Sequence, residues 1–308
     1  MVRVSRPVHN SPPPTSDGGG GSQPIATLPP GSAGKVGELR LEFGARAGKT
    51  RLLGMRCRVP FHVGRALYPE RDWPELAHLL VTMPTGGFVQ GDVASMAVTV
   101  RDGAQVHLTS QSATRAYRCE AAPIGQRLTL EARGESLLEW WPDPLIPYAG
   151  ASVDQTLSVT VDERATVLLA DCWLAGRIAR GEVHQYARLA LTTFAERPDG
   201  TLLFRDALRL EPSHQLPGVL GILGDARAVG SFFLLGPNVA AQLDVPLASC
   251  LKRVLPGRVA SSRLPGDVGV FVRVLARTSD ELRLVQGEIL KLARRELFGR
   301  EAGHRYKP

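Results

Sequence analysis

The stretch ASMAVTVRDGAQVHLTS, residues 94–110, predicts the fold of this chain more directly than any other segment. Apolar residues alternate with small or polar ones on both sides of Asp102 and Gly103. Alternation with a period of two is typical of a β-strand with one buried face, and an Asp-Gly pair between two such runs favours a hairpin. We therefore expect two antiparallel strands joined at Asp102 and Gly103.

The same strand–turn–strand pattern recurs further along the chain. Alternating runs flank turns near Gly134, Glu163 and Gly200, and GELRLEF, residues 37–43, alternates in the same way. Serial hairpins of this kind predict a mainly β fold of stacked antiparallel sheets, sandwich-like or solenoid-like.

About two α-helices are predicted in the C-terminal part. Thr278 and Glu281 have the spacing of a capping box, and an apolar stripe with helical period follows them. The stripe consists of Leu282, Val285, Ile289, Leu292 and Ala293. These features predict a helix near residues 279–297. A second helix is expected near residues 245–255, with Pro246 in its first turn.

The N-terminal segment has a different composition from the rest. Residues 1–35 are rich in Pro, Gly and Ser and almost free of large apolar side chains. Such a segment buries too little surface to offset its ordering entropy, so we expect a disordered tail. Residues 36–308 are then expected to form a single β-rich domain.

Charge and cysteine content narrow the class of protein. The formal net charge is +7 without a long Lys/Arg block, which favours a basic surface or an acidic protein partner over nucleic-acid binding. The widely spaced cysteines Cys57, Cys119, Cys172 and Cys250 fit reduced thiols rather than a zinc ribbon or a disulfide scaffold. No apolar run approaches the ~18 residues of a membrane span, and no secretory signal is apparent. We expect a cytoplasmic protein that binds no membrane.

The glycine-rich stretch TGGFVQGD, residues 85–92, is a candidate site. It lacks the Gly-Lys-Ser/Thr of a phosphate-binding loop and the order of a dinucleotide fingerprint. Gly86, Gly87 and Gly91 suit a sharp chain reversal, because glycine adopts positive φ without steric cost. Asp92 would then accept backbone N–H bonds at the start of the next strand. On these grounds a structural turn is favoured over a functional site.

Three other stretches carry candidate functional residues. In GRIARGEVHQY, Glu182 and His184 share one face if the segment is a strand. LTSQSATRAYRC, residues 108–119, is either a hydrogen-bonded strand or a recognition surface, whose members would be Gln111, Thr114, Arg115, Tyr117 and Arg118. In LEWWPDPLIPYAG, residues 138–150, Trp140 and Trp141 anchor either a core or an interface. No GxSxG or HExxH motif supports hydrolase chemistry.

Taken together, these stretches resemble the family of the urease accessory protein UreD, also called UreH. The matching pieces stand in family order as GGFVQGD, VRDGAQVHLTSQSATRAYR, LEWWPDPLIPYAGA, GRIARGE and RDALRLE, between residues 86 and 211. LEWWPDP departs from the more usual form, in which a Gln-Glu pair follows the proline, so the resemblance assigns no role to Asp143.

The resemblance implies a non-enzymatic protein that is mainly β with two helices. Such proteins bind apo-urease and, with the accessory protein UreF and the GTPase UreG, deliver nickel through their interior. Asp92 and Glu182 match the family's acidic residues linked to metal passage, and we add His184 to this path. Isolated carboxylates suit rapid release better than a thiolate site, so we expect transient Ni²⁺ and no tightly bound cofactor. The alternatives are a β-sandwich hydrolase using Asp92 and Glu182, and a plain interaction module.

Overall fold

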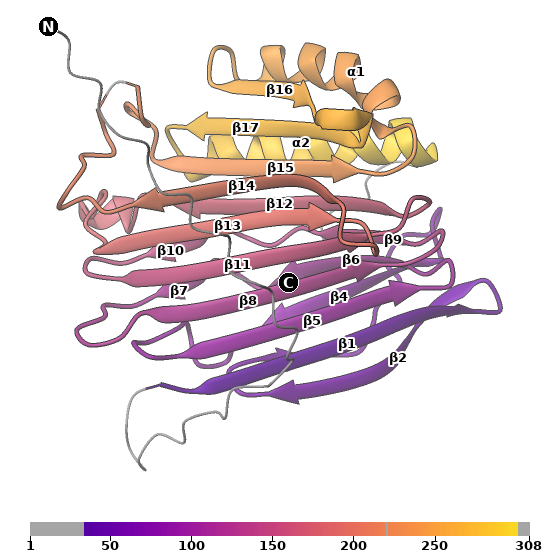
Figure 1. The fold of residues 1–308 in the computed structure, drawn as a ribbon, viewed down its shortest axis with the longest axis horizontal. Coiled ribbons are helices and arrows are strands. Elements are labelled where there is room, and N and C mark those ends of the chain that lie inside the picture. Colours follow the sequence, from indigo (N-terminus) through magenta and orange to yellow (C-terminus); the bar gives the residue numbers. More distant parts are fainter. Residues whose placement is uncertain (1–33, 220, 301–308) are drawn as a thin grey trace, which may run out of the picture. The chain divides into compact units, whose positions relative to one another are not determined.

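Two β-sheets account for most of the fold (Figure 1). The computed structural model describes residues 34–219 and 221–300, all of which belong to one unit, Ala33–Pro308. The predicted tail therefore lies, apart from residues 34 and 35, outside the described residues.

The first sheet has seven strands in the order β14-β13-β11-β8-β5-β1-β2. Its five central strands pair in parallel, and the edge strands β14 and β2 pair antiparallel. The strands are β1 Val36–Arg46, β2 Lys49–Arg58, β5 Val93–Arg101, β8 Ile124–Ala132, β11 Ser152–Val161, β13 Arg188–Glu196 and β14 Leu202–Leu210.

The second sheet has ten strands, of which eight follow the order β16-β17-β15-β12-β9-β6-β4-β3, while the short β7 and β10 pair beside them. Strands β4, β6, β9 and β12 are parallel to one another, whereas β15, β17 and β16 add antiparallel. The strands are β3 His62–Val63, β4 Leu76–Thr82, β6 Gln105–Ser110, β7 Thr114–Ala116, β9 Leu137–Trp140, β10 Leu145–Pro147, β12 Thr166–Leu174, β15 Ala228–Leu235, β16 Val259–Arg263 and β17 Gly269–Ala276.

The turn at Asp102 and Gly103 does not close a hairpin, contrary to the sequence prediction. It carries the chain from β5 in the seven-stranded sheet to β6 in the ten-stranded sheet, and the turns near Gly134 and Glu163 do the same. Of the four turns predicted from the sequence, the one at Gly200 alone joins an antiparallel pair, β13 and β14. The mainly β, stacked and solenoid-like character is confirmed, but antiparallel pairing is wrong for the central strands.

Hydrogen bonds between successive turns explain this arrangement. The N–H of Arg133 donates to the Val100 carbonyl at 2.8 Å, and the N–H of Asp162 donates to the Ala132 carbonyl at 3.0 Å. Each turn thus bonds to the next coil of the chain rather than across a hairpin. Because alternation reports only that one face of a strand is buried, it does not distinguish these two pairings.

The core between the sheets is apolar. Leu39, Val98, Leu130 and Leu157 of the seven-stranded sheet pack in one cluster with Leu138 and other residues of the ten-stranded sheet. The outer face of the ten-stranded sheet is covered by the helices α1, Val239–Val254, and α2, Ser279–Phe298 (Figure 1). Accordingly, all eight residues of β15 are buried. Two short 3₁₀ helices, η1 Ile178–Arg180 and η2 Pro265–Asp267, complete the elements.

The sequence predicts the start of α2 but not the start of α1. In α2, Thr278 accepts a hydrogen bond from the Glu281 N–H at 3.1 Å, and the whole predicted stripe is buried. In contrast, α1 begins at Val239, so Pro246 lies inside it rather than in its first turn. Asn238 is of a residue type that often caps helices, but it precedes α1 with φ of 62° and makes no side-chain capping bond.

The stacked turns lead to a stability prediction. The Asp162 carboxylate accepts a hydrogen bond from the Gly134 N–H at 2.7 Å, which joins two successive turns. Asp162→Ala should lower the free energy of unfolding by about 1 kcal/mol, the usual net contribution of such a bond. Urea denaturation would measure the change. The control is Glu163→Ala, an exposed neighbour. Equal stability of the two variants would contradict the stacked arrangement.

Candidate functional site

Loops from four of the five segments that carry the family resemblance gather at one end of the two sheets, where β7 and β10 lie (Figure 1). The fifth segment, RDALRLE, lies mostly in β14. We call the end with the four loops the stacked-loop end; it comprises residues 83–92, 111–123, 141–151 and 175–187. Here the loops continue the stacking of the strands. Phe88 bridges Ala116 in parallel, β7 pairs with β10, and the Gly150 N–H donates to the Gln185 carbonyl at 2.8 Å.

Gly86, Gly87 and Gly91 shape the first of these loops as the sequence predicts. Their φ angles are 78°, 148° and 71°, which glycine adopts readily. At Gly87 there is a second reason, because a Cβ atom would lie 2.5 Å from the Arg115 carbonyl oxygen. The loop carries the chain from β4 in one sheet to β5 in the other.

Asp92 is the buried anchor of that loop, with 2% of its surface exposed. One carboxylate oxygen accepts the Lys35 N–H at 2.6 Å and the other accepts the Val89 N–H at 2.9 Å. Its backbone carbonyl accepts the Gly125 N–H at 2.9 Å. The predicted role as a carboxylate that receives backbone N–H groups is therefore confirmed. Its role in metal passage stays a prediction.

Glu182 lies in the loop between β12 and β13, close to η1. The Arg177 guanidinium binds both of its carboxylate oxygens, with Nε at 2.7 Å, and lies 4.2 Å from the centre of the Tyr148 ring. The hydrogen bond from Arg177 is the main reason that the pKa of Glu182 lies below its ordinary value. The carboxylate is thus ionised at neutral pH and already held by a cation.

His184 does not share a strand face with Glu182, because the segment forms a loop and not a strand. His184 has φ of 53°, and its Nδ1 lies 3.1 Å from the hydroxyl oxygen of Tyr186. Trp173 packs against both rings. Burial lowers the pKa of His184, which favours the neutral imidazole that metal ions require.

The predicted recognition residues divide into a surface group and a core group. Gln111, Arg115 and Arg118 are exposed, while Thr114 and Tyr117 are half-buried. Trp140 and Trp141 are 7% and 1% exposed, and they belong to the cores on opposite faces of the ten-stranded sheet. Of the two roles considered for the tryptophans, the structure therefore supports the core.

A polar group between the two sheets has no signal in the sequence. The Asp171 carboxylate of β12 accepts hydrogen bonds from the Thr193 hydroxyl at 2.8 Å and from the Gln155 side-chain amide at 3.1 Å. Burial raises its pKa. Asp206 lies beside the same small cavity, where it pairs with Arg273 at 2.8 Å. Asp171 is the one charged residue of the apolar strand β12, but its partners Gln155 and Thr193 come from other strands, so only the tertiary structure shows which groups it contacts.

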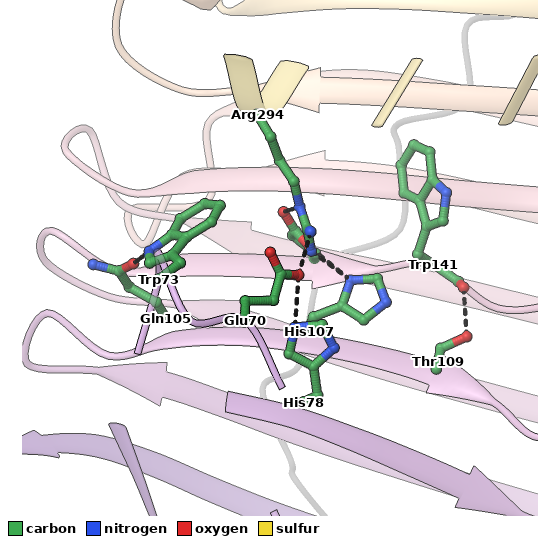
Figure 2. A network of polar contacts seen from close by, with 9 residues as sticks. Glu70, Trp73, His78, Gln105, His107, Thr109, Trp141 and Arg294 are labelled. Carbon is green, nitrogen blue, oxygen red and sulfur yellow. Dashed lines mark hydrogen bonds and ion pairs between the residues drawn. The ribbon is translucent and has the colours of Figure 1, made fainter. Parts of the chain in front are cut away.

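A second polar group fixes α2 to the ten-stranded sheet, as Figure 2 shows. Arg294 of α2 binds Glu139 of β9 with Nη2 at 2.5 Å and Glu70 with Nη1 at 2.6 Å. The Nδ1 atom of His107 lies 2.6 Å from the same Glu139 oxygen, Oε2, while Arg294 Nε donates to the other oxygen at 2.9 Å. His78 lies 3.0 Å from Glu70. Glu139, Arg294 and His107 are at most 4% exposed.

The charges in this group stabilise one another. Burial alone would raise the pKa of Glu70, but the His78 hydrogen bond and the Arg294 charge hold it at about 2. The pKa of Glu139 likewise lies far below its ordinary value, because Arg294 outweighs the effect of burial. Burial lowers the pKa of His107 to about 4, so its imidazole is neutral at pH 7. We call these residues, Glu70, His78, His107, Glu139 and Arg294, the charged staple. Removing the Arg294 guanidinium would leave two buried carboxylates without their cation.

Among residues 34–219 and 221–300, no three His, Cys, Asp or Glu side chains converge into a metal-holding group. Within the same residues, no helix has the length and apolar character needed to cross a membrane.

Comparisons with known proteins agree with the motifs. The family model described as UreD urease accessory protein matches residues 35–307. A urease accessory protein UreD 2 from Streptomyces griseus is 38% identical over 287 residues, which cover 92% of this chain and 97% of the relative. The urease accessory proteins UreD of Haloarcula marismortui and Cenarchaeum symbiosum are 33% and 29% identical, over 90% and 87% of this chain and 92% and 95% of theirs.

The bonds of Asp92 predict a structural cost for its amide variant. Asp92→Asn would turn an NH₂ group toward one of two backbone N–H donors, leaving that donor unsatisfied. We expect a loss of about 1–3 kcal/mol in the free energy of unfolding, measured in urea. Asp102→Asn is the matched control, because the Asp102 side chain is 61% exposed and asparagine tolerates its φ of 57°. A stable Asp92→Asn protein would refute the anchoring role.

The staple predicts a pH dependence with a definite sign. Glu70 and Glu139 have lowered pKa values, so their contribution is complete above pH ~4.5 and is lost as the pH falls below it. His107 titrates in the unfolded chain near pH 6.5 but in the folded protein only near 4, so stability also falls through that window. Wild-type stability should therefore decrease steadily as the pH falls from 6.5.

Arg294→Met should flatten or reverse this dependence of the free energy of unfolding on pH. Protonation removes the cost of burying an unpaired Glu139 carboxylate. The stability of the variant should therefore rise relative to that of the wild type as the pH falls toward 4.5. At pH 7 it should lose about 3–5 kcal/mol. Arg295→Met is the control, since that neighbouring side chain is 54% exposed and should cost under about 0.5 kcal/mol. Urea denaturation from pH 7 to 4.5 measures both. Parallel pH profiles for wild type and Arg294→Met would contradict the staple.

Proposed function

The chain belongs to the UreD family of urease accessory proteins, and we propose that it acts as a non-enzymatic scaffold and nickel conduit in urease maturation. It would bind apo-urease and work with a UreF-like protein and a UreG-like GTPase in the cytoplasm. The observation that carries the proposal is the family match over residues 35–307, which includes every motif at the stacked-loop end.

Acidic side chains at this end and between the sheets support the conduit. Asp92 is buried at the start of β5, Glu182 is partly buried behind Arg177, and Asp171 lies between the sheets. Carboxylate and imidazole groups bind divalent ions of the first transition row without the tight hold of thiolates. The ion is cargo in this proposal, so it enters and leaves without becoming a resident cofactor.

The bond between Arg177 and Glu182 fits transient binding. An incoming Ni²⁺ would have to displace a guanidinium that already satisfies the carboxylate, so the net gain on binding would be small. A small gain allows rapid release, which a delivery protein needs. Asp92 and Asp171 also have donors in place, from backbone N–H groups in one case and neutral side chains in the other.

No observation favours the hydrolase that uses Asp92 and Glu182 as an acid–base pair. Both oxygens of Asp92 accept backbone N–H groups, and Arg177 binds both oxygens of Glu182. A general base must lie within hydrogen-bond reach of a bound substrate, and a general acid must carry a proton. Asp92 is only 2% exposed, and Arg177 keeps Glu182 ionised, so neither residue meets its requirement. Turnover by the purified chain on a panel of hydrolase substrates would nevertheless favour the enzyme.

A complementation experiment tests the proposal. A deletion strain should contain urease polypeptide without nickel, and the wild-type gene should restore nickel content and activity. Glu182→Gln should restore about tenfold less nickel at equal expression, the lower end of the usual loss when a group around a metal ligand is changed. Nickel per urease active site would be measured by atomic absorption.

Glu120→Gln is the matched control, because Glu120 is exposed at the same stacked-loop end. It should restore nickel fully. Normal nickel loading in the deletion strain would overturn the whole proposal. Full restoration by Glu182→Gln would remove Glu182 from the conduit and leave the scaffold in place.

A further inference from the structure

Arginines and tyrosines from three loops meet on the surface of the stacked-loop end. We call this the Arg–Tyr surface, made of Arg115, Tyr117, Arg118, Tyr148, Arg177 and Arg180. The Tyr117 and Tyr148 rings lie 5.0 Å apart, edge to face, and the Arg177 guanidinium covers Tyr148 at 4.2 Å. Arginine and tyrosine are the residue types most enriched at the energetic centres of protein interfaces.

The backbone beneath this surface is held in one arrangement. Arg115 lies opposite Ile146 in the parallel pairing of β7 with β10, and the Tyr148 N–H donates to the Ala116 carbonyl at 2.9 Å. A Cβ on Gly150 would lie 3.0 Å from the Arg118 Nε, so the glycine gives this side chain its room. A surface fixed in this way loses little conformational entropy on binding.

Three cations of the surface are not neutralised within the described residues. Arg115, Arg118 and Arg180 are exposed, and they take part in none of the ion pairs formed by residues 34–219 and 221–300. In contrast, Arg40, Arg56 and Arg133, which are equally exposed, pair with Glu38 or Glu131. Other exposed arginines of the described residues, among them Arg46, Arg51 and Arg58, also form no ion pair. The stacked-loop end differs from them because its three unpaired cations stand in the loops that carry the Tyr117–Tyr148 pair and its Arg177 guanidinium.

A small cavity lies directly beside Arg115, with a volume of about 40 Å³. Polar groups of Ser110, Gln111, Ser112 and Arg115 line one part of it, and Val81, Met83, Gly86 and Ala113 line the rest. Hydroxyl and amide groups next to a guanidinium match a carboxylate, which accepts hydrogen bonds from all of them.

We propose that the Arg–Tyr surface docks an acidic segment of a protein partner, with one Asp or Glu carboxylate of that segment seated in the cavity beside Arg115. The tyrosine rings then contact apolar side chains that flank the carboxylate. The inference rests on the proposed function, in that the partner is a member of the urease-maturation assembly. A nucleic acid fits less well, because Arg177 covers the face of Tyr148 on which a base would stack.

The test uses peptides with the full-length chain. The probe is a fluorescein-labelled twelve-residue peptide of Asp, Glu and Leu, compared with its Asn/Gln counterpart and with a labelled oligo-dT of equal length. We expect the acidic peptide to bind at least tenfold more tightly than the amide peptide. Arg115→Ala/Arg118→Ala/Arg180→Ala should weaken binding at least tenfold.

A matched control carries the same change of charge elsewhere. Arg40→Ala/Arg56→Ala/Arg133→Ala removes three exposed arginines from the seven-stranded sheet and its adjoining turn and should change binding less than twofold. Ser112→Leu fills the cavity without altering charge and should weaken binding severalfold. Urea midpoints confirm that each variant is folded. Equal weakening by the two triple variants would overturn the proposal, as would tighter binding of oligo-dT than of the acidic peptide.

The peptide-binding experiment and the nickel-loading experiment can fail independently of each other. A deletion strain that loads urease normally, together with a peptide that discriminates the two triple variants, would end the urease role and keep the docking surface. Nickel-free urease in the deletion strain, together with no discrimination by the peptide, would end the docking surface and keep the urease role.

Discussion

The parallel backbone hydrogen bonds between successive coils are the constraint on which the rest of the structure depends. Each coil contributes one strand to each sheet, and the turn that joins them bonds to the turn of the next coil. The central strands of both sheets bury one face between the sheets, and the helices cover the other face of the ten-stranded sheet. The loops at the opposite end must then stack with the same spacing, which brings segments far apart in sequence into contact.

This stacking explains how a candidate site arises from separate loops. Phe88, Ala116, Tyr148 and Gln185 come from four different coils, yet consecutive backbone bonds connect them. Asp92 closes the first loop by accepting backbone N–H groups, so the residue that we propose for metal passage also holds the loop in place. A structural and a transport role are compatible, because a carboxylate oxygen has more than one lone pair.

The ten-stranded sheet carries a charged staple on the face covered by the helices. Arg294 connects the C-terminal half of α2 to Glu139 and Glu70, and both carboxylates stay ionised because the guanidinium is buried with them. Hydrophobic packing of Leu243, Leu247, Val285 and Ile289 would tolerate small shifts of the helices. Directional bonds from a planar guanidinium tolerate fewer, so the staple sets the register of α2 on the sheet.

Local sequence determined the strand content, the start of α2, the glycine turn and the capping role of Asp92, because these depend on residues within a few positions of one another. The alternating runs, the Thr278–Glu281 pair and the motif order also led to the family. Only the tertiary structure decided that the turns cross between sheets, that α1 begins at Val239, and that Glu182 lies in a loop clamped by Arg177. The hydrogen bonds of Asp171 and of the Arg294 staple could not be predicted from local sequence either, because the partners lie 16 to 224 residues apart. Periodicity reports which face of an element is buried, and it carries no information about which distant element covers that face.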